Sequence, residues 1–215
     1  LKDADSIALQ QSLRHLDRAY DSFFRKKGGY PKFKSKRYNQ SYRTMNVNSN
    51  ISIDGDNIKL PKAGKVKIVN SRDFDGRIIS ATVSRTASGR YYISLQVEEE
   101  YEVPNAGGCI GLDAGLKSLY TTSDSGIYPN PKTLSLHEKR IKRLQRSLSR
   151  KKKGSKNSEK ARLRLAREHE KVSDIRNDIQ HKITHKLASE NQVVCVEDLN
   201  VKGMMKNHRL ARSIG

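Results

Sequence analysis

The 215-residue sequence predicts a multidomain α+β protein, and three observations lead to this fold class. Two short apolar runs, 109–113 and 193–197, each end in an acidic residue. Residues 51–100 alternate apolar and polar side chains over short stretches separated by turns, which is typical of an all-β domain. Apolar residues at three- and four-residue spacing then recur from about 134 to 190 and predict two long helices.

The N-terminal part is predicted to begin with a helix over residues 4–24. Apolar side chains from Ile7 to Phe24 fall on one helical stripe, and glycines 28 and 29 follow. The next segment, 25–43, has eight Lys/Arg, no acid and four aromatic rings. Cations contact phosphates and rings can stack on unpaired bases, although the rings could equally pack on a neighbouring β-domain. The candidate nucleic-acid-binding residues here are Lys32, Lys34, Lys36, Arg37 and Arg43.

Residues 51–100 are predicted to form a small β-barrel or curved sheet. Short strands flank a turn at 54–57, and two longer strands flank a loop at 86–90 that contains Gly89. Several short strands with such turns are typical of a small barrel. The segment 104–108, which contains one proline and two glycines, is expected to separate this domain from the next.

The second half, 105–215, is predicted to contain three strands, a helical hairpin at about 134–190 and a fourth strand at 193–197. This element order is typical of an RNase H/RuvC-like α/β nuclease core. There the fourth strand lies parallel beside the first, and ligands collect at the carboxyl ends of such strands. The sequence therefore predicts a partial nuclease core with an inserted helical hairpin.

The acids that end the two apolar strands are the candidate catalytic and metal-binding residues, Asp113 and Glu197. A carboxylate beside a hydrophobic strand is costly to desolvate unless a cation neutralises it. Two such carboxylates at adjacent strand ends could hold the two Mg²⁺ ions of a phosphodiester hydrolase. Strand alternation alone does not choose between Glu197 and Asp198. Asp198 could instead form a turn or cap, and Asp113 could be an ordinary turn residue at the end of a strand.

The hairpin is strongly basic and is predicted to contact phosphates. Residues 137–171 contain 15 Lys/Arg against 4 Glu, a net charge of +11, and the whole chain has a formal charge of +20. The four glutamates can neutralise only a few of these cations through ion pairs within the helices, so most of the positive charge stays available for phosphates. The candidate phosphate-binding residues are Arg143, Arg146, Arg150, Lys151, Lys152, Lys153 and Lys156.

Other chemistries find little support in the sequence. His181 and His185 have the spacing of metal ligands on a helix, but Lys182 stands where a zinc protease has glutamate, so solvated histidines are favoured. Cys109 and Cys195 lie in apolar runs and are expected to be buried free thiols, and no Cys-x-x-Cys motif predicts zinc. No apolar run has membrane-spanning length, so we expect a cytoplasmic protein with no membrane partner.

Two motifs resemble those of the OrfB/TnpB proteins encoded by bacterial insertion sequences. The first is Ile-Gly-Leu-Asp-Ala-Gly-Leu-Lys at 110–117, and the second is Val-Glu-Asp-Leu-Asn-Val-Lys-Gly-Met at 196–204. Further likeness at 8–13, 33–36, 129–132 and 144–155 extends the resemblance over essentially the whole chain.

This resemblance implies a transposon-encoded, RNA-guided DNA endonuclease, kin to the type V CRISPR effectors and long described as a transposase. Guide RNA and target DNA would be its partners, and a RuvC-like site with Mg²⁺ would cut the DNA. Residues 1–29 would belong to the recognition lobe, 30–104 to the wedge domain and 105–215 to the nuclease domain. Asp113 and Glu197 would be the first two catalytic acids of a bacterial or archaeal, nucleoid-associated protein.

The chain also departs from the family pattern. The family's third catalytic Asp and its zinc ribbon follow the second motif and are not among these residues, so we expect a fragment that is inactive alone. The outer edge of the strand at 193–196 is expected to pair with another copy or with further segments of the protein. A non-catalytic RNA-guided DNA-binding regulator and a plain RuvC/RNase H-type nuclease are the alternative functions.

We expect nucleic-acid affinity to fall steeply with salt, because binding through cations releases the counterions that surround the phosphates. If about six phosphates are contacted, affinity should drop about 1000-fold between roughly 50 and 200 mM salt. Arg146→Ala should reduce the slope of log K against log salt by about one. Filter binding at several salt concentrations measures both quantities, and a flat salt dependence would contradict the prediction.

Overall fold

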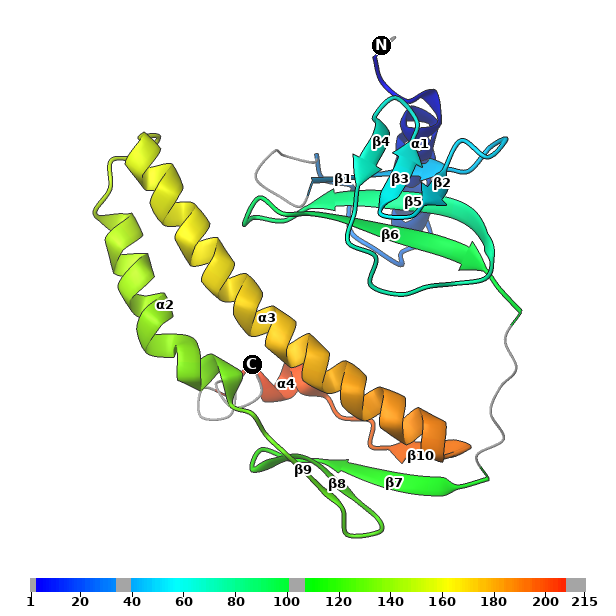
Figure 1. Cartoon of the computed structure of the whole chain (residues 1–215). Helices are drawn as coiled ribbons and strands as arrows, with labels where there is room; N and C mark the ends of the chain where they lie inside the picture. Colours follow the sequence, from blue (N-terminus) through cyan, green and yellow to red (C-terminus); the bar gives the residue numbers. More distant parts are fainter. Residues whose placement is uncertain (1–2, 34–39, 101–106, 208–215) are drawn as a thin grey trace. The chain divides into compact units, whose positions relative to one another are not determined.

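The computed structural model describes residues 3–33, 40–100 and 107–207, and the chain divides into two compact units, Leu1–Tyr101 and Glu102–Gly215 (Figure 1). The first unit contains α1 (Ser6–Phe24), β1 (Gln40–Met45), β2 (Ser52–Asp54), β3 (Asn57–Leu60), β4 (Gly64–Lys67), β5 (Arg77–Arg85) and β6 (Tyr91–Glu98). The second contains β7 (Cys109–Ala114), β8 (Ser118–Thr122), β9 (Ile127–Pro129), α2 (Thr133–Ser149), α3 (Lys156–Glu190), β10 (Val193–Val196) and α4 (Val201–Met204). The mixed α+β class is confirmed.

Helix α1 begins at an aspartate cap that also fixes the helix to the sheet. The Asp5 carboxylate accepts a hydrogen bond from the Ile7 N–H at 3.1 Å, and its second oxygen accepts one from the Thr44 hydroxyl on β1. The predicted helix is confirmed, but its predicted apolar stripe is largely exposed, including Leu13 and Phe24. Within the described part of the unit, the helix contacts β1, which is too narrow to cover a 19-residue helix.

The β-rich part forms two open three-stranded sheets, so the predicted closed barrel is wrong. One sheet has the order β1-β5-β6, and the other has the order β2-β3-β4. Strands β2 to β4 have only three or four residues each and pair among themselves, and no strand pairing joins the two sheets in the described part of the unit. The core lies between the sheets and consists of Ile51, Ile58, Leu60, Ile78 and Ala81.

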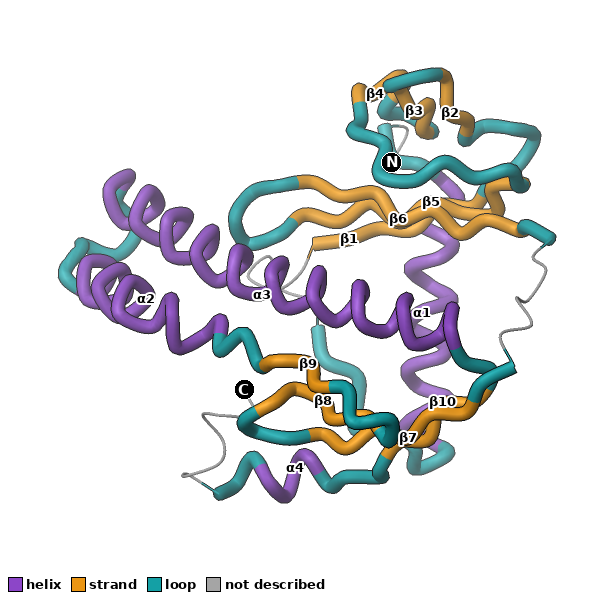
Figure 2. Tube along the Cα trace, turned by 60° about the horizontal axis from the view of Figure 1, so that its bottom comes forward, coloured by secondary structure: helices purple, strands orange, loops and turns teal. Residues whose placement is uncertain are grey.

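The second unit contains a four-stranded sheet with the order β10-β7-β8-β9 (Figure 2). Strands β7, β8 and β9 are antiparallel neighbours, whereas β10 returns after the helical hairpin and pairs with β7 in parallel. The predicted element order and the predicted parallel pairing of the first and fourth strands are therefore confirmed. Helix α3 covers one face of this sheet, where Ile183 and Leu187 pack against Ile110.

Helices α2 and α3 confirm the predicted helical hairpin and share a buried charge. Glu168 on α3 is 4% exposed, and its two carboxylate oxygens lie 2.7 Å from His137 Nδ1 and 2.9 Å from Arg140 Nε on α2. A buried carboxylate requires such partners because desolvating it alone costs several kcal/mol, on the order of the whole fold's stability. The pair of contacts therefore fixes the alignment of the two helices.

Strand β10 is more exposed than its apolar sequence predicts. All four of its residues are exposed, and Val196 reaches 69%. Cys109 and Cys195 are exposed free thiols, so their predicted burial is wrong. Among the described residues, β10 has one neighbouring strand, β7. Helix α3 packs on the sheet face that carries Ile110, whereas the two cysteines lie on the other face. Among the helices described, none is long and apolar enough to cross a membrane.

Leu187→Ala should destabilise the protein by about 2–5 kcal/mol, because it leaves a cavity between α3 and the β10-β7-β8-β9 sheet. Leu187 is 4% exposed, whereas Leu136 on α2 is 77% exposed, so Leu136→Ala makes the same chemical change without a cavity. Chemical denaturation followed by circular dichroism compares the two variants. Equal losses of unfolding free energy would contradict the packing of α3 on this sheet.

Candidate active site

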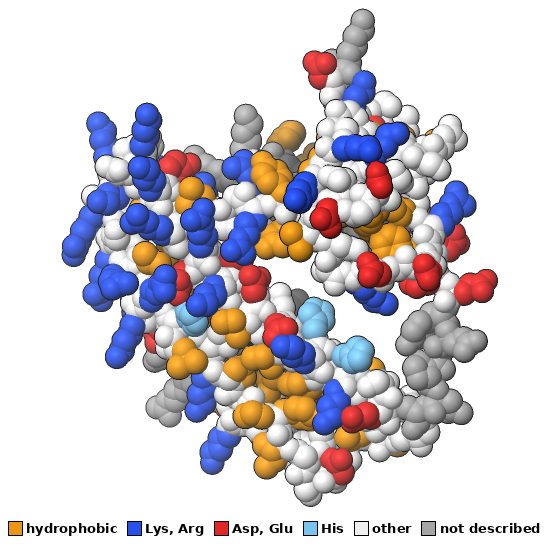
Figure 3. All heavy atoms as spheres, viewed as in Figure 1, with side chains coloured by type: hydrophobic (Ala, Val, Ile, Leu, Met, Phe, Trp, Pro, Cys, Tyr) orange, Lys and Arg blue, Asp and Glu red, His pale blue; other side chains and the backbone are white. Residues whose placement is uncertain are grey.

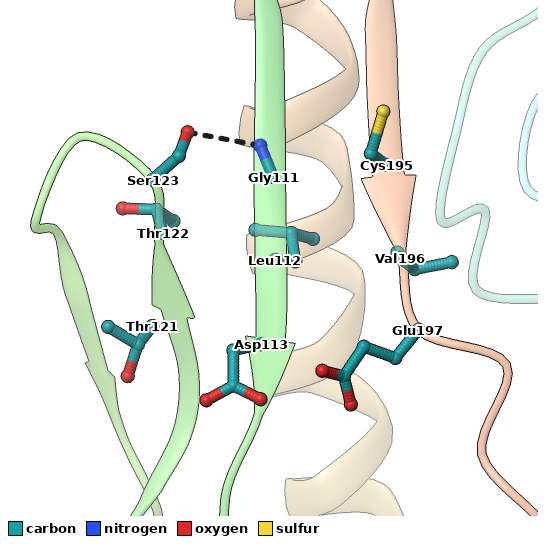
Figure 4. Close-up of a pocket in the computed structure, with 9 residues that line it drawn as sticks. All are labelled: Gly111, Leu112, Asp113, Thr121, Thr122, Ser123, Cys195, Val196 and Glu197. Atoms are coloured by element: carbon teal, nitrogen blue, oxygen red, sulfur yellow. Dashed lines mark hydrogen bonds between the residues drawn. The ribbon is translucent and has the colours of Figure 1, made fainter.

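The pairing of β10 with β7 decides where the two predicted acids lie. Val196 is opposite Leu112, so the next residue on each strand, Glu197 and Asp113, follows at the same level. Side chains alternate between the two faces of a sheet, which puts Asp113 with Gly111 on one face and Ile110 with Leu112 on the other. Figure 4 shows the Glu197 side chain reaching toward Asp113. The structure thus brings the two predicted carboxylates together.

The two carboxylates line an open pocket of about 430 Å³ on the sheet face opposite α3. Both residues are solvent-exposed, so a charged ligand could reach them without crossing the protein core. The lining residues are Gly111, Leu112, Asp113, Thr121, Thr122, Ser123, Cys195, Val196 and Glu197. Asp198 is exposed and does not line this pocket.

Strand β8 forms the second wall of the pocket with hydroxyl groups. Thr121 is the register partner of Asp113. Two residues on, the Ser123 hydroxyl accepts a hydrogen bond from the Gly111 N–H at 3.1 Å and so extends the β7–β8 ladder. Sequence analysis missed these hydroxyls, because the pattern of the sequence does not give the register between β7 and β8.

The turn between β8 and β9 is held by an acidic residue that lies outside the pocket. The Asp124 carboxylate accepts hydrogen bonds from the Thr122 hydroxyl and from the Gly126 N–H. The Thr122 hydrogen bond is the main cause that lowers the pKa of Asp124, and the Gly126 N–H adds to it. Asp124 is therefore a turn-forming carboxylate, and its side-chain oxygen is already engaged.

The geometry fits a divalent cation held from two sides. Mg²⁺ prefers carboxylate oxygens and commonly binds through one or two of them plus water and substrate phosphate. Asp113 and Glu197 supply such oxygens from neighbouring strand ends. Within the described residues, no group of three His, Cys, Asp or Glu side chains is close enough to hold a metal. The local ligand set is therefore two acids, open to a further ligand.

The predicted phosphate-binding residues are accessible at the tip of the hairpin. Figure 3 shows Lys and Arg side chains gathered over the α2–α3 hairpin. The predicted residues of this group are all exposed: Arg143, Arg146, Arg150, Lys151, Lys152, Lys153 and Lys156.

The predicted residues near the N-terminus are less uniform. Lys32 is exposed. The Arg43 guanidinium lies across the first sheet and donates to Ser80 Oγ and Gln96 Oε1, so part of its hydrogen-bonding capacity is engaged inside the unit. Lys34, Lys36 and Arg37 lie outside the described residues.

Comparison with known proteins assigns the chain to a family. The fold and the site define a class of protein. It is an α+β protein with a basic helical hairpin and with two acids side by side at the ends of parallel strands. The family model OrfB_IS605, described as "Probable transposase", matches residues 92–208, more than half of the chain. The chain belongs to this family, and the predicted resemblance is confirmed.

Two curated relatives carry more specific names. The protein named "Putative RNA-guided DNA endonuclease InsQ" of Escherichia coli (strain K12) is 38% identical over 211 residues, which cover 96% of this chain and 52% of the relative. A protein of Streptomyces pristinaespiralis named "Putative RNA-guided DNA endonuclease" is 36% identical over 217 residues, covering 100% of this chain and 54% of the relative. The chain therefore spans about half the length of these relatives.

Millimolar Mg²⁺ or Mn²⁺ should raise the unfolding temperature of the wild-type protein, because a ligand that binds only the folded state stabilises it. The gain is about 2.7 kcal/mol at a hundredfold excess over the Kd. Asp113→Asn and Glu197→Gln should each lose most of the gain, while Asp198→Asn should retain it. Thermal unfolding with and without the metal measures this effect. An unchanged gain in the Asp113 variant would show that the cation binds elsewhere.

Proposed function

We propose that this chain is the part of a transposon-encoded RNA-guided DNA endonuclease that carries two acids of a RuvC-like, Mg²⁺-dependent site. The observation that carries this proposal is the convergence of Asp113 and Glu197 at the ends of two parallel strands. The names of the relatives and the family support the same reading. Guide RNA and target DNA are the proposed partners.

Bound Mg²⁺ would activate a water molecule and neutralise charge on the phosphate and on the leaving oxygen. Asp113, near the end of β7, would be the central metal ligand, and Glu197, directly after β10, would be the second. A water proton would leave as the new P–O bond forms, and the departing oxygen would take up a proton as the old bond breaks. Because both acids are exposed in an open pocket, a phosphodiester backbone would reach them from the solvent.

The remainder of the chain has a consistent role in this proposal. Residues 1–29 would belong to the recognition lobe, 30–104 to a wedge-like domain, and 105–215 to the nuclease domain. The exposed cations of the hairpin would hold phosphates of the guide or the target. The third carboxylate that the resemblance implies would complete the metal site from outside the described residues.

A non-catalytic RNA-guided DNA-binding protein of the same fold is the second candidate. The observation that favours it is that, among the described residues, only two acids, Asp113 and Glu197, line the pocket, and no third ligand joins them. A plain RuvC/RNase H-type nuclease explains less, because such an enzyme requires neither the β-rich first unit nor the basic hairpin.

Asp113→Ala in the complete protein should reduce Mg²⁺-dependent DNA cleavage at least about 100-fold, because a metal ligand that acts in the transition state is lost. Affinity for guide RNA and target DNA should stay nearly unchanged, since phosphate contacts lie elsewhere. Glu197→Ala should behave alike.

Asp198→Ala is the matched control and should lose less activity. A cleavage assay with guide RNA and a matched target, together with binding measurements, tests all three variants. Full activity in Glu197→Ala with loss in Asp198→Ala would reverse the assignment of the second acid. Target binding without cleavage by the wild-type protein would favour the non-catalytic candidate.

A further inference from the structure

The wall of the pocket formed by β8 has a chemistry that the two acids lack. A phosphodiester carries negative charge on its non-bridging oxygens, and the carboxylates of Asp113 and Glu197 repel that charge. Only cations and hydrogen-bond donors can hold those oxygens. Hydroxyl groups on β8 are the donors that the pocket offers beside the acids.

Thr121 is the hydroxyl best placed for this role. It is the register partner of Asp113 on the adjacent strand and lines the same pocket. Figure 4 shows Asp113 between Thr121 and Glu197, with the Thr121 hydroxyl and both carboxylates directed toward the same end of the strands. Ser123 lies further from this end, where its hydroxyl accepts a hydrogen bond from the Gly111 N–H away from the two carboxylates.

The hydrogen bond between Thr121 and Ser118 leaves the Thr121 proton available when Ser118 is the donor. The Oγ1 of Thr121 lies 3.2 Å from the Oγ of Ser118, and either atom can be the donor of that bond. If Ser118 donates, Thr121 accepts that bond and can donate its O–H to a ligand at the same time. A hydroxyl that accepts one hydrogen bond is a stronger donor in the next, because the bonds polarise each other.

We propose that Thr121 is a positioning residue that donates a hydrogen bond to a non-bridging oxygen of the scissile phosphate, on the side of Asp113 opposite Glu197. This inference rests on the proposed nuclease function and adds a contact to it. Asp113 and Glu197 then hold the cations, and Thr121 orients the phosphate in front of them. Of these three residues, Thr121 contacts the phosphate directly, whereas Asp113 and Glu197 act on it through the cations.

Three variants of the complete protein test the proposal in the guided cleavage assay with Mg²⁺. Thr121→Val keeps the shape of the side chain but removes the donor, and it should slow single-turnover cleavage about 10- to 100-fold. Thr121→Ser restores the hydroxyl and should recover most of the rate. Ser118→Ala removes the hydroxyl that hydrogen-bonds to Thr121 Oγ1. It should change the rate only a few-fold, which is the scale of one neutral hydrogen bond.

A sulfur substitution at the scissile phosphate separates a direct contact from a structural role. Replacing one non-bridging oxygen by sulfur weakens the hydrogen bond it accepts, so one of the two diastereomers should be cut more slowly by the wild-type protein. That slowing should shrink in Thr121→Val, because the contact is already absent and the two changes are then not additive. A structural role of Thr121 would leave the effect of sulfur unchanged.

The outcomes distinguish this proposal from the proposed function. If the wild-type protein cuts DNA and Thr121→Val cuts equally fast, or if Ser118→Ala is as slow as Thr121→Val, the phosphate contact is wrong while the nuclease stands. If the wild-type protein does not cut, the nuclease proposal fails, and binding decides the role of Thr121. In that case Ca²⁺ should increase DNA affinity in the wild type and less in Thr121→Val, and equal increases would overturn the contact.

Discussion

The parallel pairing of β10 with β7 is the constraint on which the candidate site depends. Four backbone partners, from Val193 with Cys109 to Val196 with Leu112, determine that Glu197 emerges beside Asp113. A shift of one residue would turn Glu197 to the face covered by α3 and present Asp198 instead, because side chains alternate along a strand. The α2–α3 hairpin makes this pairing possible by returning the chain to β7, and the contacts of Ile183 and Leu187 with Ile110 anchor the return.

The sequence predicted correctly those elements whose regularly spaced apolar side chains pack against another helix or a sheet. The two long helices carry apolar residues at regular spacing because they pack on each other and on the sheet, and the strand order followed from the positions of the acids. The structure also removed an ambiguity that the pattern left open, since it places Glu197 in the pocket and Asp198 outside it. The site roles of both residues stay predictions.

The expectations that failed concern burial and closure, which depend on neighbours that periodicity does not reveal. Cys109 and Cys195 lie in apolar runs and are nonetheless exposed, because β10 has one neighbouring strand and α3 covers the other face. The stripe on α1 is genuine in the sequence, but in the described part of its unit β1 and the ring of Tyr30 leave most of it uncovered. Strand β1 itself was missed because its polar residues resemble a phosphate-binding segment, whereas Thr44 in that strand is fully buried.

Helix α3 has a mechanical consequence that follows from its length. Its 35 residues run without interruption from the basic tip at Lys156 to the contacts with the sheet around Ile183. At about 1.5 Å per residue, these two points are about 40 Å apart along one stiff rod. That span corresponds to about 12 base pairs of a nucleic-acid duplex at about 3.4 Å per step. In the proposed nuclease, α3 would therefore hold phosphates bound at the basic tip at a fixed distance from the sheet that carries Asp113. A bend in the helix would change that distance and so the position of the nucleic acid relative to the two acids.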